Sequence, residues 1–330
     1  MKTMKWLLRR EFWEHKGGFV WAPLIAALAM VVLVASVVGY GISSGKMTGD
    51  SIHLTVNGKQ VHGTSIGDMV TPETRAEMAE VAANTYIAGG APIFVVLPVV
   101  AFFYCLAALY DDRRDRSILF WKSLPISDSQ TVLSKLITVL VAAPLISIGI
   151  AVGASLVMLL LGGLAASYHG VSLFGAVLSK PNFYLTPFYL VAMVPVYVLW
   201  ALPTVGWLML VSSWAKSKVF LWAVGLPLIV AVLAKWLEYL VAMTYSGPAL
   251  NIGWYVQRVL ESILLNLIPG TWFMRAGAEL PLPARGTVDI LSMVGYSWST
   301  LTQPALWIGA VAGIAMILGA IRLRRWRDEG

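Results

Sequence analysis

Charged side chains are scarce in this sequence, and several reactive groups are nearly missing. Asp, Glu, Lys and Arg make up 12% of the 330 residues, against 58% hydrophobic ones, whereas about a quarter of a soluble domain is charged. The one cysteine, Cys105, excludes an intramolecular disulfide. Among the four histidines, His53 and His62 could meet across a hairpin, but a metal site needs further ligands. The composition disfavours a soluble enzyme, a disulfide scaffold and a metalloprotein.

Motifs for ATP hydrolysis and for intramembrane chemistry are missing as well. A phosphate-binding loop requires GxxxxGK[ST] between a strand and a helix. The nearest string, GISSGKMT at 41–48, lacks the first glycine and has methionine after the lysine. The long apolar runs hold no chain of Asp, Glu or His of the kind that proton-coupled transporters and intramembrane hydrolases use. We expect no enzymatic site, no metal and no cofactor in this chain.

What the sequence does contain is long uncharged runs. Five of them exceed the ~20 residues that cross a bilayer, and a sixth run continues through Lys235 and Glu238. We therefore predict an all-α integral membrane protein, and the first run is too long for a cleaved signal peptide. The six transmembrane helices are predicted at about 19–41, 86–109, 133–162, 186–212, 219–243 and 303–321.

Lys and Arg lie mostly on one side of these predicted spans. Sixteen of the 24 fall before the first span, after the sixth, in the loop between spans four and five, or around 113–135, where the second span ends and the third begins. Because Lys and Arg favour the cytoplasmic side, we expect both termini in the cytoplasm. The net charge of +7 suits anionic lipid head groups, so the expected partner of these charges is the lipid bilayer and not a nucleic acid.

Two domains are expected: a cytoplasmic interfacial helix at 1–18 and a six-span domain at 19–330. In MKTMKWLLRREFWEHK, apolar residues share one helical face and basic residues lie away from it. The first outer loop, about 42–85, predicts a small β-hairpin around Asn57-Gly58 followed by a helix with Thr71 as N-cap. This outer module could be a lid, a contact for a partner or a spacer.

The last outer loop predicts a segment that dips back into the membrane. At about 250–285, ESILLNLIPGTWFMRAG is too short to cross the bilayer and contains Pro269-Gly270, which indicates a re-entrant helix–turn. In the fifth span Lys235 and Glu238 lie three residues apart on one helix face. We favour an ion pair near the outer interface, where Lys can reach the head groups; the alternative is that both residues line an outer vestibule.

The loop at about 110–130, between the second and third spans, combines charge with a short apolar helix. In YDDRRDRSILFWKSLPIS the charged residues can pair with one another, and the apolar residues after them form one large face that ends at Pro125. Ser127 and Gln130 then predict a capping box at the start of the third span. Such a helix either docks on a partner protein, with ~1.5–3 kcal/mol from each buried anchor, or lies on the lipid surface.

Taken together, these segments resemble the ABC-2-type permeases, the membrane subunits of ATP-binding-cassette exporters. The resemblance covers essentially the whole chain and rests on MKWLLRREFWEHK, the six-span plan, YDDRRDRSILFWKSLPISDSQTVLSK with Lys135, and the outer NLIPGTW segment. It implies a bacterial cytoplasmic (inner) membrane location and a coupling helix that docks on a separate ATPase subunit, which carries ATP and Mg. The residues it assigns to that contact are Arg113, Arg114, Arg116, Ile118, Phe120, Trp121 and Leu124.

The resemblance also implies a second permease copy, as a homodimer or a paralogous heterodimer, because the chain holds one permease unit. Two functions from other classes stay open on the residues alone. One is an ion-coupled secondary transporter, and the other is a membrane scaffold or sensory subunit that recruits a cytoplasmic partner. Drug, peptide, lipid and polysaccharide cargo all fit spans rich in Trp, Met and Leu.

Overall fold

The computed structural model describes residues 2–44, 54–56, 59–61, 71–115, 126–244, 251–275 and 290–326. Six of its helical stretches are long and apolar enough to cross a membrane, and each predicted span overlaps one of them. This confirms the prediction of six apolar helices long enough to cross a membrane. The six stretches are Gly17–Ser43, Pro72–Arg114, Asp128–Tyr168, Pro181–Trp214, Leu221–Met243 and Pro304–Trp326.

Each of these stretches is built from consecutive helical elements. The first half of the chain forms α1 (Lys2–Glu14), η1 (Gly17–Trp21), α2 (Ala22–Ser43), α4 (Pro72–Thr85), η2 (Tyr86–Gly90), α5 (Ile93–Ala108), α6 (Tyr110–Arg114), α8 (Asp128–Ile137), η3 (Thr138–Ala142) and α9 (Ala143–Tyr168). The second half forms α10 (Phe174–Leu178), α11 (Pro181–Trp214), η4 (Leu221–Gly225), α12 (Leu226–Thr244), α13 (Ile252–Leu264), α14 (Thr271–Arg275), α15 (Ile290–Ser299), η5 (Thr300–Thr302) and α16 (Pro304–Trp326).

Three of the spans contain the same local structural feature, a π-helical turn followed by a proline. The turns η1, η3 and η4 end two residues before Pro23, Pro144 and Pro227 respectively. A proline ring collides with the carbonyl four residues before it and has no N–H to donate. A wider turn just ahead of the proline relieves this collision, so each helix continues past its proline as one span.

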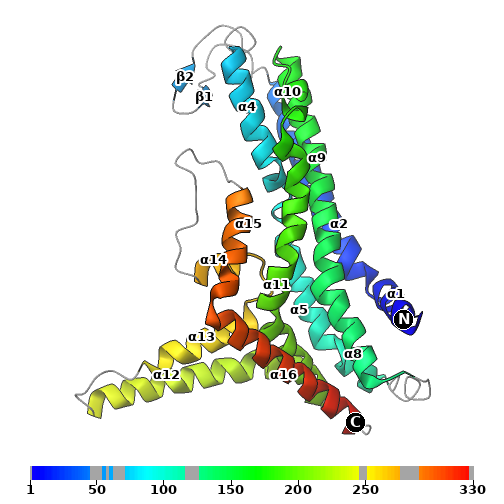
Figure 1. Cartoon of the computed structure of the whole chain (residues 1–330), viewed down its shortest axis with the longest axis vertical. Coiled ribbons are helices and arrows are strands. Elements are labelled where there is room, and N and C mark those ends of the chain that lie inside the picture. The colour runs from blue at the N-terminus through cyan, green and yellow to red at the C-terminus, as the bar shows by residue number, and fades with distance from the viewer. Residues whose placement is uncertain are drawn as a thin grey trace.

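The helices diverge from the end of the molecule at which both termini lie (Figure 1). From there α2, α5 and α9 run towards α4 and α10, while α12 and α13 run out to the other side as an antiparallel pair (Figure 1). The long helix α11 stands between these arms and packs against α5, α15 and α16.

The tightest helix crossing in the core joins α11 to α16. A Cβ on Gly206 would lie 2.5 Å from the Gly313 carbonyl oxygen, and a Cβ on Gly313 would lie equally close to the Leu202 backbone. Because both positions lack a side chain, the two backbones can approach directly, as small residues allow between membrane helices. The buried residues around this crossing include Trp200, Val205 and Leu306.

The outer loop departs from the predicted hairpin/helix module. Two strands, β1 (Leu54–Val56) and β2 (Lys59–Val61), pair antiparallel with Leu54 opposite Val61, but the turn between them lies outside the described residues. A two-stranded ladder this short is not stable by itself in water. The helix is present, and the Thr71 hydroxyl caps it by accepting from Thr74 N at 3.2 Å.

That helix, however, continues into the second span and does not form a separate unit with the strands. α4 continues through η2 and α5 in the helical stretch Pro72–Arg114, and its buried Ala79 and Ala83 pack with Val177 of α10. α4 is therefore held by apolar contact with α10, the fold is all-helical, and a separate hairpin/helix unit is not supported.

The segment after α13 turns back at the predicted Pro269-Gly270. Gly270 has φ +90°, a left-handed conformation that glycine adopts without strain. Beyond the turn, Trp272 is buried and donates from Nε1 to Ser297 Oγ at 3.1 Å. Before it, Leu267 O accepts from the Tyr197 hydroxyl at 3.2 Å. The turn therefore packs into the core between α11 and α15.

Candidate functional site

The predicted coupling loop is described only at its two ends. Arg113 and Arg114 lie on α6, which leads into the loop, and Asp128 begins α8, which leaves it. The predicted capping box is confirmed: Ser127 Oγ accepts from Gln130 N at 3.3 Å, and the Gln130 side chain accepts from Ser127 N. The predicted contact residues Arg116, Ile118, Phe120, Trp121 and Leu124 lie outside the described residues.

Arg113 holds α6 against the end of α11. One guanidinium nitrogen donates to the Ser212 carbonyl at 2.6 Å and to the Ala215 carbonyl at 2.9 Å. These carbonyls lie at the C-terminus of α11, where a cation is favourable for both hydrogen bonding and the helix dipole. Arg113 therefore has a structural task that sequence reasoning did not find, whereas Arg114 is exposed and pairs with Asp111 and Asp115.

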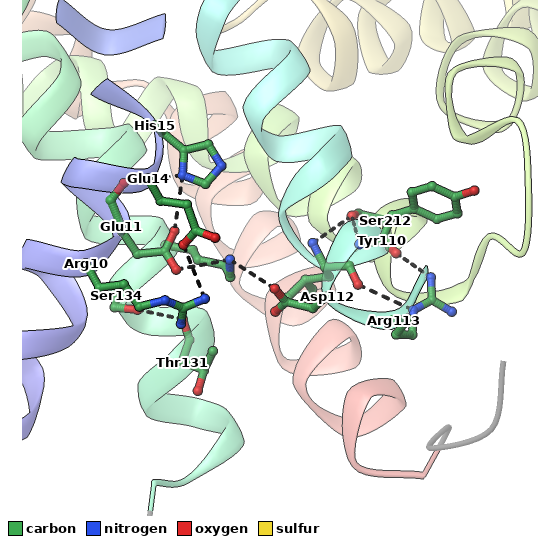
Figure 2. A network of polar contacts seen from close by, with 12 residues as sticks. Arg10, Glu11, Glu14, His15, Tyr110, Asp112, Arg113, Thr131, Ser134 and Ser212 are labelled. Carbon is green, nitrogen blue, oxygen red and sulfur yellow. Dashed lines mark hydrogen bonds and ion pairs between the residues drawn. The ribbon is translucent and has the colours of Figure 1, made fainter. Parts of the chain in front are cut away.

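The same junction is fastened by a serine hydroxyl. Where the helix breaks between α5 and α6, Ser212 Oγ accepts from Leu109 N and Tyr110 N, each at 3.0 Å, and donates to Leu106 O at 2.8 Å. Figure 2 shows Ser212 between Tyr110 and Arg113. Because all these groups are buried or partly buried, the bonds fix the angle at which α6 leaves the second span.

A buried carboxylate from the N-terminal helix reaches the same region. Glu11 of α1 is 1% exposed. It accepts a hydrogen bond from the Tyr104 hydroxyl at 2.9 Å and lies 3.1 Å from Lys135 Nζ. His15, partly exposed on the next turn, has Nδ1 3.8 Å from the same carboxylate. Figure 2 shows Glu11 and His15 directed towards α8 and α5.

Two further carboxylates and a second cation complete the cluster. Asp112 Oδ1 lies 3.7 Å from Lys135 Nζ, and Asp112 Oδ2 lies 2.7 Å from an Arg324 nitrogen. Arg324 also donates from Nε to Asp128 Oδ1 at 3.2 Å. The order Glu11–Lys135–Asp112–Arg324–Asp128 alternates in sign. We refer to these five residues as the charge network.

Burial makes the charge network a strong constraint on position. Lys135 and Arg324 are 2% and 3% exposed, and an ion this deep is tolerated only when it is paired. Its members come from α1, α6, α8 and α16, so it joins both ends of the 110–130 loop to the two chain termini. Sequence reasoning gave Lys135 only as part of a resemblance, expected Asp112 to pair with the charges next to it in the loop, and missed the other members. The sequence did contain a signal for a buried charge: Lys135 is an isolated cation whose neighbours on the same helix face, Val132, Leu136 and Val139, are apolar and buried.

The predicted pair in the fifth span has a different arrangement. In the part of α12 that the structure describes, no ion pair joins Lys235 to Glu238. The Glu238 carboxylate instead accepts from Gly253 N at 3.1 Å, at the start of α13, where a negative charge is favourable. Glu238 thus links α12 to α13. An outer vestibule lined by both residues stays a prediction.

No group of three or more His, Cys, Asp or Glu side chains suited to a metal ion occurs in the described ranges, and His53 and His62 lie outside them. Comparisons with family models, with curated proteins and with solved structures give no match for this chain. Its function has to be inferred from its own residues and their geometry.

Proposed function

We propose that this chain is the transmembrane permease subunit of an ABC-2-type exporter. It lies in the bacterial cytoplasmic (inner) membrane with both termini in the cytoplasm, pairs with a second permease copy, and docks a separate ATP-binding-cassette ATPase through the 110–130 loop. ATP and Mg belong to that ATPase. The six-span architecture and the resemblance described for the sequence support this assignment.

The observation that carries the proposal is where the charge network lies. It joins the helix that enters the loop, through Asp112, to the helix that leaves it, through Asp128 and Lys135. A force applied to the loop by a docked ATPase would move α6 and α8 together. Because Glu11 and Arg324 belong to the same network, α1 and α16 would follow. This is the connection that a coupling loop needs, since the spans and not the loop must open the conduit.

The docking contact itself comes from the sequence. Phe120, Trp121 and Leu124 are the proposed apolar anchors, and Arg114 and Arg116 the charge partners, whereas Arg113 is engaged by the end of α11. In this arrangement ATP binding closes the ATPase dimer, which pulls on the 110–130 loop of each of the two permease copies and so drives export.

Co-purification tests the proposal. The full chain is expressed with its neighbouring genes, solubilised in mild detergent and captured through a tag on the permease. We expect an ATP-binding subunit in the eluate, retained by the wild type and by Trp6→Asp, a change at an exposed α1 tryptophan, and lost with Trp121→Asp. A permease that elutes without a nucleotide-binding partner contradicts the proposal.

One observation favours a second candidate, an ion-coupled transporter. Glu11 and Asp112 are buried carboxylates, and buried acids in membrane proteins often carry protons. Both are paired with cations at the end of the bundle that carries the termini, which suits a structural task better than a path across the membrane. Uptake or release driven by an ion gradient in ATP-free vesicles would favour this candidate over the permease.

A further inference from the structure

An apolar pocket opens between α5, α9, α11 and the turn at Pro269-Gly270. Its volume is about 370 Å³, within the range of ~300–1,000 Å³ typical of small-molecule sites. None of the described residues that line it is charged, and the hydroxyl of Tyr197, the most polar of these side chains, is already bonded to Leu267 O. The pocket therefore offers a ligand apolar contact and almost no hydrogen bonding.

The pocket has a buried floor and an exposed rim. Leu97, Tyr197 and Trp272 on the floor are each less than 5% exposed, whereas Val95 on the rim is 66% exposed and Ile268 is 44% exposed. A helix with its side chains is ~10–12 Å across, too wide to reach residues buried to this degree. A single hydrocarbon chain is slender enough to do so.

The floor lies at the depth of the membrane interior. Leu97 and Tyr197 fall near the middle of the uncharged runs 81–110 and 181–215, each long enough to cross the ~30 Å hydrocarbon layer. Water is a poor occupant because it needs two or more polar partners. An empty pocket is also unfavourable, since its lining would lose van der Waals contacts. The molecules that surround the rim at this depth are lipid acyl chains.

We propose that this pocket binds one acyl chain of a membrane phospholipid, which enters past Val95 and Ile268 and lies against Tyr197 and Trp272. The bound chain fills the space between α5, α11 and the turn before α14, so the lipid packs against these elements as part of the folded protein. This inference needs the six-span architecture and is independent of coupling to an ATPase.

Photo-crosslinking tests the site. The full chain is reconstituted into phosphatidylcholine vesicles that contain a trace of phosphatidylcholine with a diazirine on its acyl chain, and labelled residues are mapped by mass spectrometry. Two separate variants, Val95→Trp and Ile268→Trp, place a bulky side chain at the rim without altering the floor. Val32→Trp, on the exposed face of α2, is the matched control because it adds the same side chain on a lipid-facing surface away from the pocket.

We expect labels on the floor residues Tyr197 or Trp272 in the wild type and in Val32→Trp, and loss of these labels in both rim variants. Labels on α2 should stay unchanged, which also reports that each variant is inserted and folded. Labels confined to α2 and α12 in the wild type would show surface lipid only and overturn the proposal. Equal floor labelling in all variants would overturn it too, as would a disulfide between two copies through Val95→Cys, since a second copy would then cover the rim.

Discussion

At the scale of single residues, the charge network is the feature that most constrains this molecule. Replacing a buried ion pair by apolar residues often costs little, but removing one partner leaves the other charge unpaired. Glu11, Asp112 and Asp128 share two cations, Lys135 and Arg324. Each cation therefore has two carboxylates that depend on it, so the network fixes where helices lie more than it adds stability.

Lys135→Met is the sharpest test of that dependence. It keeps the length of the side chain but leaves Glu11 and Asp112 facing one less cation, which should destabilise the fold by ~3–5 kcal/mol. We expect a clear fall in the melting temperature of the purified protein in detergent. Lys216→Met, at an exposed lysine, should melt like the wild type, and equal melting of the two variants would rule out the network as drawn.

Ser212→Ala tests the junction between the second span and α6. The change leaves Leu109 N and Tyr110 N without their acceptor, and a buried unsatisfied donor costs ~1–3 kcal/mol. Thermal unfolding should therefore shift downward. Ser213→Ala is the control, because the Ser213 hydroxyl bonds Leu210 O within its own turn. A Ser212→Ala protein as stable as Ser213→Ala would show that the hydroxyl does not hold the junction.

Contacts between residues close in sequence could be predicted from the sequence, and contacts between distant residues could not. Thr71 and the Ser127–Gln130 capping box were predictable because a cap acts on the backbone three residues away. Glu11 meets Lys135, and Arg324 meets Asp112, across more than a hundred residues of sequence, so no local spacing could reveal these pairs. The same distance explains why Arg113 was assigned to a partner protein instead of to the end of α11.

At the scale of helices, close packing of α11 on α16 depends on two positions without side chains. Gly206→Ala should push the helices apart, since its Cβ would lie 2.5 Å from the Gly313 carbonyl oxygen. The expected result is lower thermal stability, although alanine is intrinsically better than glycine in a helix by ~1 kcal/mol. Gly149→Ala on α9, where nothing lies within 4 Å of the new Cβ, should be neutral or stabilising. The reverse ranking would contradict the packing.

The helices could be predicted from the sequence wherever one long apolar run forms one membrane-spanning helix. Long uncharged runs gave six helices because a chain in lipid must satisfy its own backbone hydrogen bonds. The helix that begins at Pro72 was predicted, but its continuation into the second span was not, since the position of α4 depends on apolar contact with α10 and not on hydropathy. The outer module was predicted from local signals, the Asn57-Gly58 turn with alternating residues around it and the Thr71 N-cap, and local signals do not show what the strands and the helix pack against.

At the scale of the whole molecule, the charge network brings α1 and the end of α16 together, and the proposed topology places this end in the cytoplasm. Cys105 is buried, so the native chain gives a low background with a membrane-impermeant thiol reagent. We expect such a reagent to label Asn251→Cys in intact cells and Arg325→Cys only after the membrane is made permeable. Labelling of Arg325→Cys in intact cells would show that the topology is the reverse of the proposed one. The 110–130 loop would then lie outside the cytoplasm, where an ATPase could not reach it.

The central claim is that an ATPase acts on this chain through the 110–130 loop. The most direct test is the rate of ATP hydrolysis by the complex of permease and ATPase in lipid vesicles, compared between the wild type, Trp121→Asp and the control Trp6→Asp. Loss of a buried tryptophan anchor worth ~1.5–3 kcal/mol should weaken docking about ten- to hundredfold. We predict that permease-dependent hydrolysis collapses in Trp121→Asp and persists in Trp6→Asp. Hydrolysis in Trp121→Asp equal to that of the wild type would contradict the claim.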